Sequence, residues 1–330
     1  MHAVPEVTGH GLITRLEQAV SATDTMIVTG ARATDLFLSE GGDVIGARCQ
    51  RPDGAIEAIA ARRTILACNG YGGNPDLVAR HIPEMKDALY FGHPGNQGEA
   101  ILWGEKIGAV PTHLSGYQGH GSVAHPHGIL VTWALMMEGG IQVNLEGRRF
   151  SNEHQGYSEQ AVAVLAQPEQ TAFNIFDGRL QQLGRKFEDF RNAEENGAVI
   201  VADSPAELAT RIGIDSDALE ATLNEAGLLA KSGEPDGFGR QFSADTLLRA
   251  PYCAVRVTGA LFHTQGGLLV DDHARVKRAD GSVFDSLFAC GGAACGVSGP
   301  DVSGYLSGNG LLTALALGHL AGGFAGQEGA

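Results

Sequence analysis

Three glycine-rich turns in this sequence lie where the backbone could bind a ligand. Residues 68–74 follow a short apolar run, Gly291 and Gly292 follow another at 287–290, and residues 307–310 precede an apolar stretch at 309–324. Open α/β sheets bind ligands where a strand ends in such a turn. A helix N-terminus offers N–H groups to negative charge. These turns therefore predict a ligand held largely by the backbone.

Histidines and cysteines suggest other chemistry. His120, His125 and His127 could ligate a metal, but no regular element fixes them and no carboxylate completes the set. We therefore predict no metal site. The five cysteines form no C-x-x-C pair, which favours reduced thiols in a cytoplasmic protein. Cys290 and Cys295 are interpreted as buried small hydrophobic residues and not as a redox pair.

The elements that must position these residues follow from periodicity and turn signals. A helix is expected over 9–21, and Asp53-Gly54 predicts a hairpin between 44–49 and 55–60. A strand is also expected at 25–29. The middle of the chain is rich in histidines and in helical patterns, and it lies between two regions of strand-and-turn texture. Its helices are expected at 158–167, 205–212 and 215–231. This order of elements along the chain predicts one α/β domain formed by residues 1–116 together with 264–330. An α+β domain at 117–263 is inserted between its two parts.

Composition excludes several classes of protein. The 330 residues include 43% hydrophobic and 18% charged residues, typical of a globular chain with more than one domain. The net charge of −15, with no lysine/arginine block, argues against nucleic acid and anionic membranes as partners. No apolar run reaches the roughly 18 residues that a membrane span needs.

Three motifs carry a resemblance to a known family. Residues 65–71 read I-L-A-C-N-G-Y, residues 143–153 read V-N-L-E-G-R-R-F-S-N-E, and His263 begins H-T-Q-G-G, followed by L-F-A-C-G-G at 287–292 and S-G-N-G at 307–310. Together they resemble the fumarate reductase/succinate dehydrogenase flavoprotein family, which also contains the 3-ketosteroid dehydrogenases. The resemblance covers roughly residues 8–323 and implies an FAD-binding Rossmann-like domain with an inserted capping domain.

The resemblance also implies a non-covalent FAD and the residues that bind it. The helix N-terminus at 307–312 would face the flavin where charge accumulates on reduction. The cofactor-binding residues that the motifs imply are Ala67, Cys68, Asn69, Gly70, Gly98, Glu99, Gly266, Gly267, Gly291, Gly292, Ser307, Gly308, Asn309, Gly310, Leu311 and Leu312.

One part of the family pattern has no counterpart here. The family opens with a strand, G-x-G-x-x-G and a helix, and before residue 9 no such segment is present. We therefore expect the chain to lack the primary site for the ADP half of FAD. A fragment is the favoured explanation, and a mis-started reading frame and a divergent family member are the alternatives.

The substrate positions depart from those of the dicarboxylate enzymes. His120 matches the first substrate histidine and Thr132 the substrate threonine, whose acidic neighbour is replaced by Trp133. Phe262 replaces the histidine before the H-T motif, with His263 next to it. The proton-donor arginine falls on or near Tyr157, and the carboxylate-binding arginine becomes Tyr305. Losing these arginines removes the fork that fits a carboxylate.

These departures favour a neutral enone or ketone as the substrate. As in the ketosteroid dehydrogenases, the resemblance implies that Tyr157 exchanges a proton with carbon, that Tyr305 hydrogen-bonds the carbonyl, and that His120 contributes to catalysis. We expect an oxidoreductase acting on a CH–CH bond, with a small-molecule substrate and an electron donor or acceptor that the sequence does not identify. Two alternatives stay open: a non-catalytic homologue, and a fumarate- or succinate-type enzyme.

Overall fold

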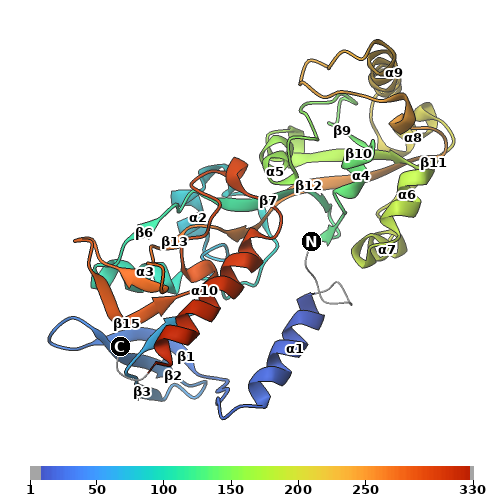
Figure 1. Cartoon of the computed structure of the whole chain (residues 1–330). Coiled ribbons are helices and arrows are strands. Elements are labelled where there is room, and N and C mark those ends of the chain that lie inside the picture. Colours follow the sequence, from blue (N-terminus) through green and yellow to red (C-terminus); the bar gives the residue numbers. More distant parts are fainter. Residues whose placement is uncertain (1–8, 328–330) are drawn as a thin grey trace.

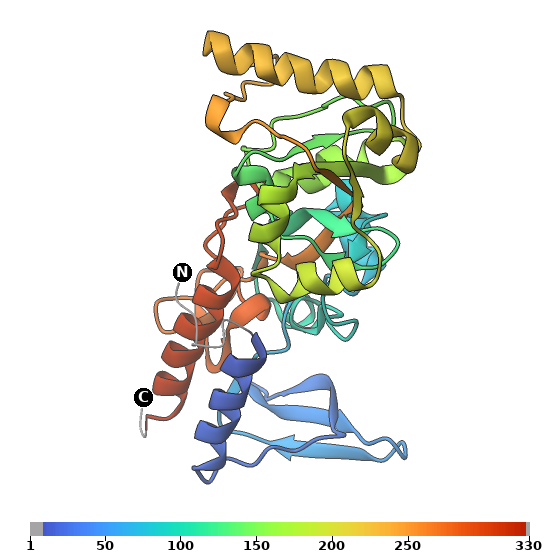
Figure 2. The same cartoon turned by 90° about the vertical axis from the view of Figure 1, so that its right-hand side faces the viewer.

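The computed structural model describes residues 9–327, which form two lobes joined by long strands (Figure 1). Figures 1 and 2 both place helix α9 and the sheet β1–β2–β3 at opposite ends of the molecule. The α/β class predicted from the sequence is confirmed.

The first lobe contains two three-stranded sheets. An antiparallel sheet has the order β1–β2–β3, and a mixed sheet has the order β14–β15–β4, in which β15 and β4 run parallel. The lobe's strands are β1 (Arg32–Leu38), β2 (Val44–Gln50), β3 (Ile56–Ala60), β4 (Thr64–Leu66), β6 (Pro111–Thr112), β13 (Gly267–Leu268), β14 (Arg275–Lys277) and β15 (Val283–Ala289). Its helices are α1 (Gly9–Ser21), α2 (Pro75–His81), α3 (Glu99–Ile107) and α10 (Asn309–Ala325).

The second lobe is built on a seven-stranded sheet. Its central strand pairs with four other strands and runs from one lobe into the other. The strands are β5 (Leu89–Tyr90), β7 (Tyr117–Ala124), β8 (Ile129–Leu130), β9 (Ile141–Val143), β10 (Thr171–Asp177), β11 (Ile200–Ala202) and the central β12 (Tyr252–Thr264). The helices are α4 (Ala134–Met137), α5 (Tyr157–Leu165), α6 (Gly178–Gly184), α7 (Glu188–Glu195), α8 (Pro205–Ile212) and α9 (Ser216–Ser232).

Several predicted boundaries are confirmed because local capping determines them. Ser204 Oγ accepts the Glu207 N–H at 3.2 Å and starts α8, and Asp215 accepts the Ala218 N–H at 2.8 Å and starts α9. The strand predicted at 25–29 is wrong, because that segment is exposed and has no partner strand.

β7 and β12 mark the change from one lobe to the other. They pair antiparallel from Tyr117 and Thr264 inward, so the chain leaves the first lobe and returns to it at neighbouring points. This pairing supports the predicted insertion at 117–263, whose exact bounds stay a prediction.

A buried ion network fixes the loop after β9. Glu153, with a side chain 1% exposed, binds Arg149 Nε at 2.9 Å, Arg240 Nη1 at 2.8 Å and the Gln142 N–H at 2.9 Å. Arg149 also pairs with Asp236. Burial raises the pKa of Glu153, but the two guanidinium groups outweigh burial and hold that pKa below its usual value. The motif at 143–153 is thus a structural element of the second lobe.

Replacing Glu153 with Gln should destabilise the protein by about 3–5 kcal/mol, because two buried arginines lose their shared counterion. A depressed carboxyl pKa stabilises the fold above the unfolded-state pKa, and this stabilisation disappears as the pH falls through the folded-state value. The variant should therefore also lose stability less steeply in acid. Urea denaturation at several pH values measures both effects. Glu207→Gln, which breaks an exposed pair with Arg211, is the matched control and should change the stability much less than Glu153→Gln. Equal effects of the two substitutions would contradict the account.

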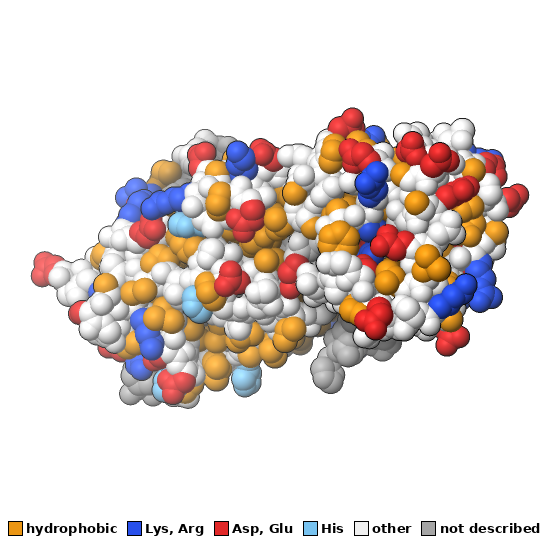
Figure 3. Space-filling view, turned by 90° about the horizontal axis from the view of Figure 1, so that it is seen from above, with side chains coloured by type: hydrophobic (Ala, Val, Ile, Leu, Met, Phe, Trp, Pro, Cys, Tyr) orange, Lys and Arg blue, Asp and Glu red, His pale blue; other side chains and the backbone are white. Residues whose placement is uncertain are grey.

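No helix in residues 9–327 is both long and apolar enough to cross a membrane. On the face drawn in Figure 3, basic side chains lie singly or in small groups among acidic ones.

Candidate active site

A cavity of about 710 Å³ lies where the predicted glycine-rich turns of the first lobe converge with β7 and β12. Its lining combines the end of β4, the turn after β15 and the N-terminus of α10. Seven of the predicted cofactor-binding residues line it: Ala67, Asn69, Gly291, Gly292, Gly308, Gly310 and Leu311. Ile13 of α1, which lies beside α10 in Figures 1 and 2, also borders it.

The backbone at this cavity has the features expected for a polar ligand. Asn69 has φ 65°, a left-handed conformation that Asn tolerates, and this residue turns the chain as it leaves β4. A Cβ at Gly292 would lie 2.6 Å from the Gly70 nitrogen, so only glycine allows the two turns to meet there. The 17-residue helix α10 has Gly308 at its N-cap and no side-chain cap. The Asn309 N–H donates to the Leu306 carbonyl at 3.0 Å, which leaves the N–H groups of Gly310 and Leu311 to face a ligand. These features fit the isoalloxazine end of FAD.

Other predicted cofactor residues are outside the cavity lining. The Gly98 N–H donates to the Gly70 carbonyl at 3.1 Å, and Glu99 is in the first turn of α3. Gly266 packs on the backbone of His113 and Gly267 on that of Ala294. Five more residues complete the set outside the lining: Cys68, Gly70, Ser307, Asn309 and Leu312. Their cofactor role stays a prediction, although the glycines shape the frame around the cavity.

Next to the cavity, seven rings form an aromatic cluster: Phe91, His120, Trp133, Tyr157, Phe262, His263 and Tyr305. Of these, His263 and Tyr305 also line the cavity. The structure therefore brings together six of the seven residues that the sequence predicted for catalysis and substrate binding. The seventh, Thr132, lies just before α4, where its hydroxyl oxygen accepts the Ala134 N–H at 3.4 Å.

His120 is at the centre of the aromatic cluster. Its ring stacks between Tyr157, with centroids 4.9 Å apart, and Phe262, at 5.2 Å, and Trp133 meets it edge-on. Burial lowers the pKa of His120 to about 3, so the imidazole is neutral at physiological pH. Because Nδ1 accepts the Ser122 N–H at 3.2 Å, the proton is on Nε2. His120 is thus an uncharged donor.

Tyr157 and Tyr305 contact each other. Their rings meet edge-on with centroids 6.0 Å apart. Burial, together with a hydrogen bond to Tyr157, raises the pKa of the Tyr305 hydroxyl. Tyr305 consequently stays protonated in neutral solution and can act as a hydrogen-bond donor.

Sequence reasoning missed a polar network that ties His263 to α10. Gln265 Nε2 lies 3.3 Å from His263 Nε2, and its Oε1 accepts the Ser298 hydroxyl at 2.9 Å. Asn309 Nδ2 in turn donates to Ser298 at 3.0 Å. Burial lowers the pKa of His263, which favours its neutral form. Sequence reasoning also missed Gln118, which lines the cavity. The signal that could have found it is its position two residues before His120, because alternate residues of a strand face the same side.

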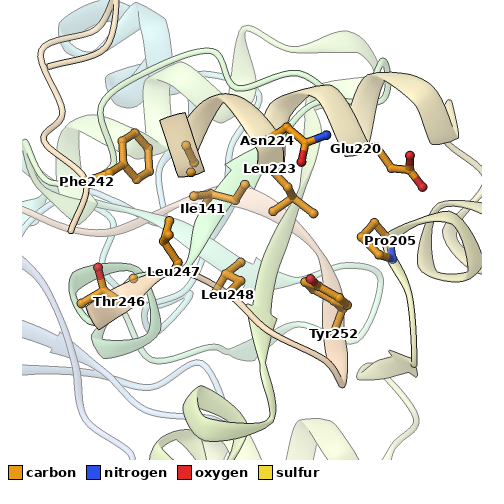
Figure 4. A pocket seen from close by; sticks show the side chains of 13 residues that line it. Ile141, Pro205, Glu220, Leu223, Asn224, Phe242, Thr246, Leu247, Leu248 and Tyr252 are labelled. Carbon is orange, nitrogen blue, oxygen red and sulfur yellow. The ribbon is translucent and has the colours of Figure 1, made fainter. Parts of the chain in front are cut away.

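A second hollow of about 270 Å³ lies in the other lobe, between α9 and residues 242–248 (Figure 4). Leu223, Leu247, Leu248 and Ile141 line it, with Tyr252 at one side. None of the aromatic cluster borders it. Among residues 9–327, the group with metal-ligand spacing is Asp271, Asp272 and His273, outside both hollows.

Comparison with known proteins decides the family. The sequence model of a family described as "FAD binding domain" matches residues 1–311. This chain belongs to that family. FAD is therefore its cofactor, in agreement with the sequence prediction and with the cavity.

Similar proteins include both enzyme types named by the resemblance. A probable fumarate reductase of Shewanella frigidimarina is 28% identical over 315 residues, which are 96% of this chain and 53% of that protein. A 3-oxosteroid 1-dehydrogenase of Mycobacterium tuberculosis is 27% identical over 356 residues, 95% of this chain and 62% of that protein. The open conformation of a flavocytochrome c3 fumarate reductase superposes with a TM-score of 0.80 at 27% identity, covering 98% of this chain and 56% of that one. The chain thus spans about half the length of such relatives.

Proposed function

We propose that the chain acts in an FAD-dependent oxidoreductase of CH–CH bonds, with a neutral enone or cyclic ketone as its substrate. The observation that carries this proposal is the aromatic cluster beside the flavin cavity. Its rings supply apolar surface and uncharged donors, and none of its members is a lysine or arginine. A dicarboxylate in such a site would have no cation to pair with, and burying an unpaired carboxylate costs free energy of binding.

Four residues of the cluster have roles in this proposal. Tyr305, kept protonated by burial, donates a hydrogen bond to the substrate carbonyl and thereby stabilises the enolate-like charge that develops on it. Tyr157 exchanges a proton with the carbon next to that carbonyl. His120 and Phe262 provide a flat surface for an unsaturated ring. Bound FAD would supply or accept the hydride at the other carbon.

Related proteins support the reaction type more than the substrate. The similar proteins named above include a probable fumarate reductase at 28% identity and a 3-oxosteroid 1-dehydrogenase at 27%, so both substrate classes occur among relatives of similar identity. The choice between them rests on the tyrosines and on the neutral state of His120.

The test is anaerobic reoxidation of the reduced, FAD-loaded protein. A cyclic enone such as 2-cyclohexenone should restore the oxidised flavin absorption, because it accepts a hydride at its β-carbon and a proton at its α-carbon. Cyclohexanone, which has the carbonyl but no C=C bond, is the matched control and should leave the flavin reduced. A protein that never takes up FAD, or that responds equally to both ketones, would overturn the proposal.

A further inference from the structure

A thiol and an imidazole contact each other beside the flavin cavity. Cys295 Sγ lies 3.4 Å from His113 Nδ1, within reach of an S–H···N hydrogen bond. The Cys295 side chain is half-buried and that of His113 exposed. The sequence interpretation of Cys295 as a buried hydrophobic residue is therefore wrong, because its thiol faces a polar partner at the surface.

The fold holds both side chains in place. The Cys295 N–H donates to the Leu268 carbonyl at 2.9 Å, on the short strand β13 that pairs with β6. His113 follows β6 directly and has φ 51°, a left-handed conformation uncommon for a residue with a side chain. Gly266 packs against the His113 backbone and leaves no room for a Cβ. A strained backbone maintained by its surroundings is often found at functional positions.

The other cysteines lack this arrangement. Cys49, Cys253 and Cys290 are buried. Cys68 is half-buried like Cys295, and burial raises the pKa of both thiols. Each thiol has a backbone partner, Ala100 for Cys68 and the Gly296 carbonyl for Cys295, so the imidazole contact is what separates the two. Among the cysteines, all of which lie within the described residues, the imidazole contact belongs to Cys295. That contact matters because the thiolate, and not the thiol, is the nucleophile.

We propose that Cys295 and His113 form a nucleophilic pair that is alkylated by α,β-unsaturated carbonyl compounds. His113 takes the thiol proton, and Sγ bonds to the β-carbon of the electrophile. The π electrons of the C=C bond move toward the carbonyl to give an enolate, and the α-carbon then takes the proton from His113. The addition needs no oxidant or reductant.

The position of Cys295 connects this chemistry to the cofactor. Its two neighbours in the chain, Ala294 and Gly296, line the 710 Å³ cavity. Neither Cys295 nor His113 itself lines the cavity, so a bulky group on Sγ would act on FAD by displacing the turn at 294–296. The pair would thus be a modification site through which reactive enones reduce flavin occupancy.

N-ethylmaleimide, itself an unsaturated carbonyl compound, is the probe, with peptide mass spectrometry to locate the adduct. In the native protein at pH 7, Cys295 should be labelled at least about tenfold faster than Cys68. The variant His113→Asn removes the base and keeps a residue that tolerates left-handed φ. Burial raises the pKa of the Cys295 thiol, so labelling of this variant should slow by about tenfold or more and recover at higher pH. The buried Cys49 and Cys253 report on folding, because they should stay unlabelled.

Equal labelling of Cys295 and Cys68, or an unchanged rate in His113→Asn, would overturn the proposal. These measurements need no flavin, so they succeed or fail independently of the proposed oxidoreductase activity. In a second arm, the labelled protein should take up FAD at least about tenfold more weakly than Cys295→Ser treated in the same way. Equal uptake would show that the pair does not control the cavity.

Discussion

Replacing Tyr157 with Phe should lower turnover by about 10²–10⁴-fold, the usual contribution of a positioned acid or base. The substitution keeps the ring that stacks on His120 and removes only the hydroxyl that bonds Tyr305. Substrate affinity should change much less than turnover, because the apolar contacts persist. Single-turnover flavin reoxidation by the enone, followed at several enone concentrations, separates the two effects.

Tyr252→Phe is the control for that experiment. Tyr252 borders the separate hollow of Figure 4 and has no place in the aromatic cluster. It should keep full activity. A Tyr157→Phe protein as active as Tyr252→Phe would remove Tyr157 from the proton-transfer role.

Gly292→Ala should weaken FAD binding by about 10–100-fold. The new methyl group would lie 2.6 Å from the Gly70 nitrogen, which belongs to the backbone and cannot rotate away. Such overpacking costs about 1–3 kcal/mol, and each 1.4 kcal/mol is tenfold in affinity. Titration of the apoprotein with FAD, followed by flavin fluorescence, measures the dissociation constant.

Gly318→Ala serves as the comparison for Gly292→Ala. Gly318 is within α10, away from the cavity lining, and a Cβ there would meet nothing within 4 Å. It should leave FAD affinity unchanged and favour the helix slightly. If both substitutions weaken FAD equally, the turns at 68–70 and 290–292 do not form the flavin site.

Much of the fold could be predicted because its signals are local. Ser204 and Asp215 act as helix caps within three residues, and the hairpin at Asp53-Gly54 needs only its own turn. The segment 25–29 was predicted wrongly for the complementary reason: strand formation depends on a partner elsewhere in the chain, which apolar residues alone do not reveal.

The candidate site was predicted in its residues and not in its contacts. Family motifs located Tyr157, Tyr305 and His120, but the neutral state of His120 depends on burial and on the Ser122 N–H, which no pattern encodes. Gln265 and Ser298 were missed because their roles arise from contacts between segments far apart in sequence. The pairing of Cys295 with His113, 182 positions apart, depends on the same long-range packing.

The central claim is that the tyrosines replace a carboxylate-binding site with one for a neutral carbonyl compound. The most direct measurement compares the rates at which 2-cyclohexenone and fumarate, at equal concentration, reoxidise the reduced FAD-loaded protein without oxygen. The account predicts fast reoxidation by the enone and at least about 100-fold slower reoxidation by fumarate, since a buried unpaired carboxylate costs several kcal/mol. Reoxidation by fumarate at the same rate or faster would contradict it.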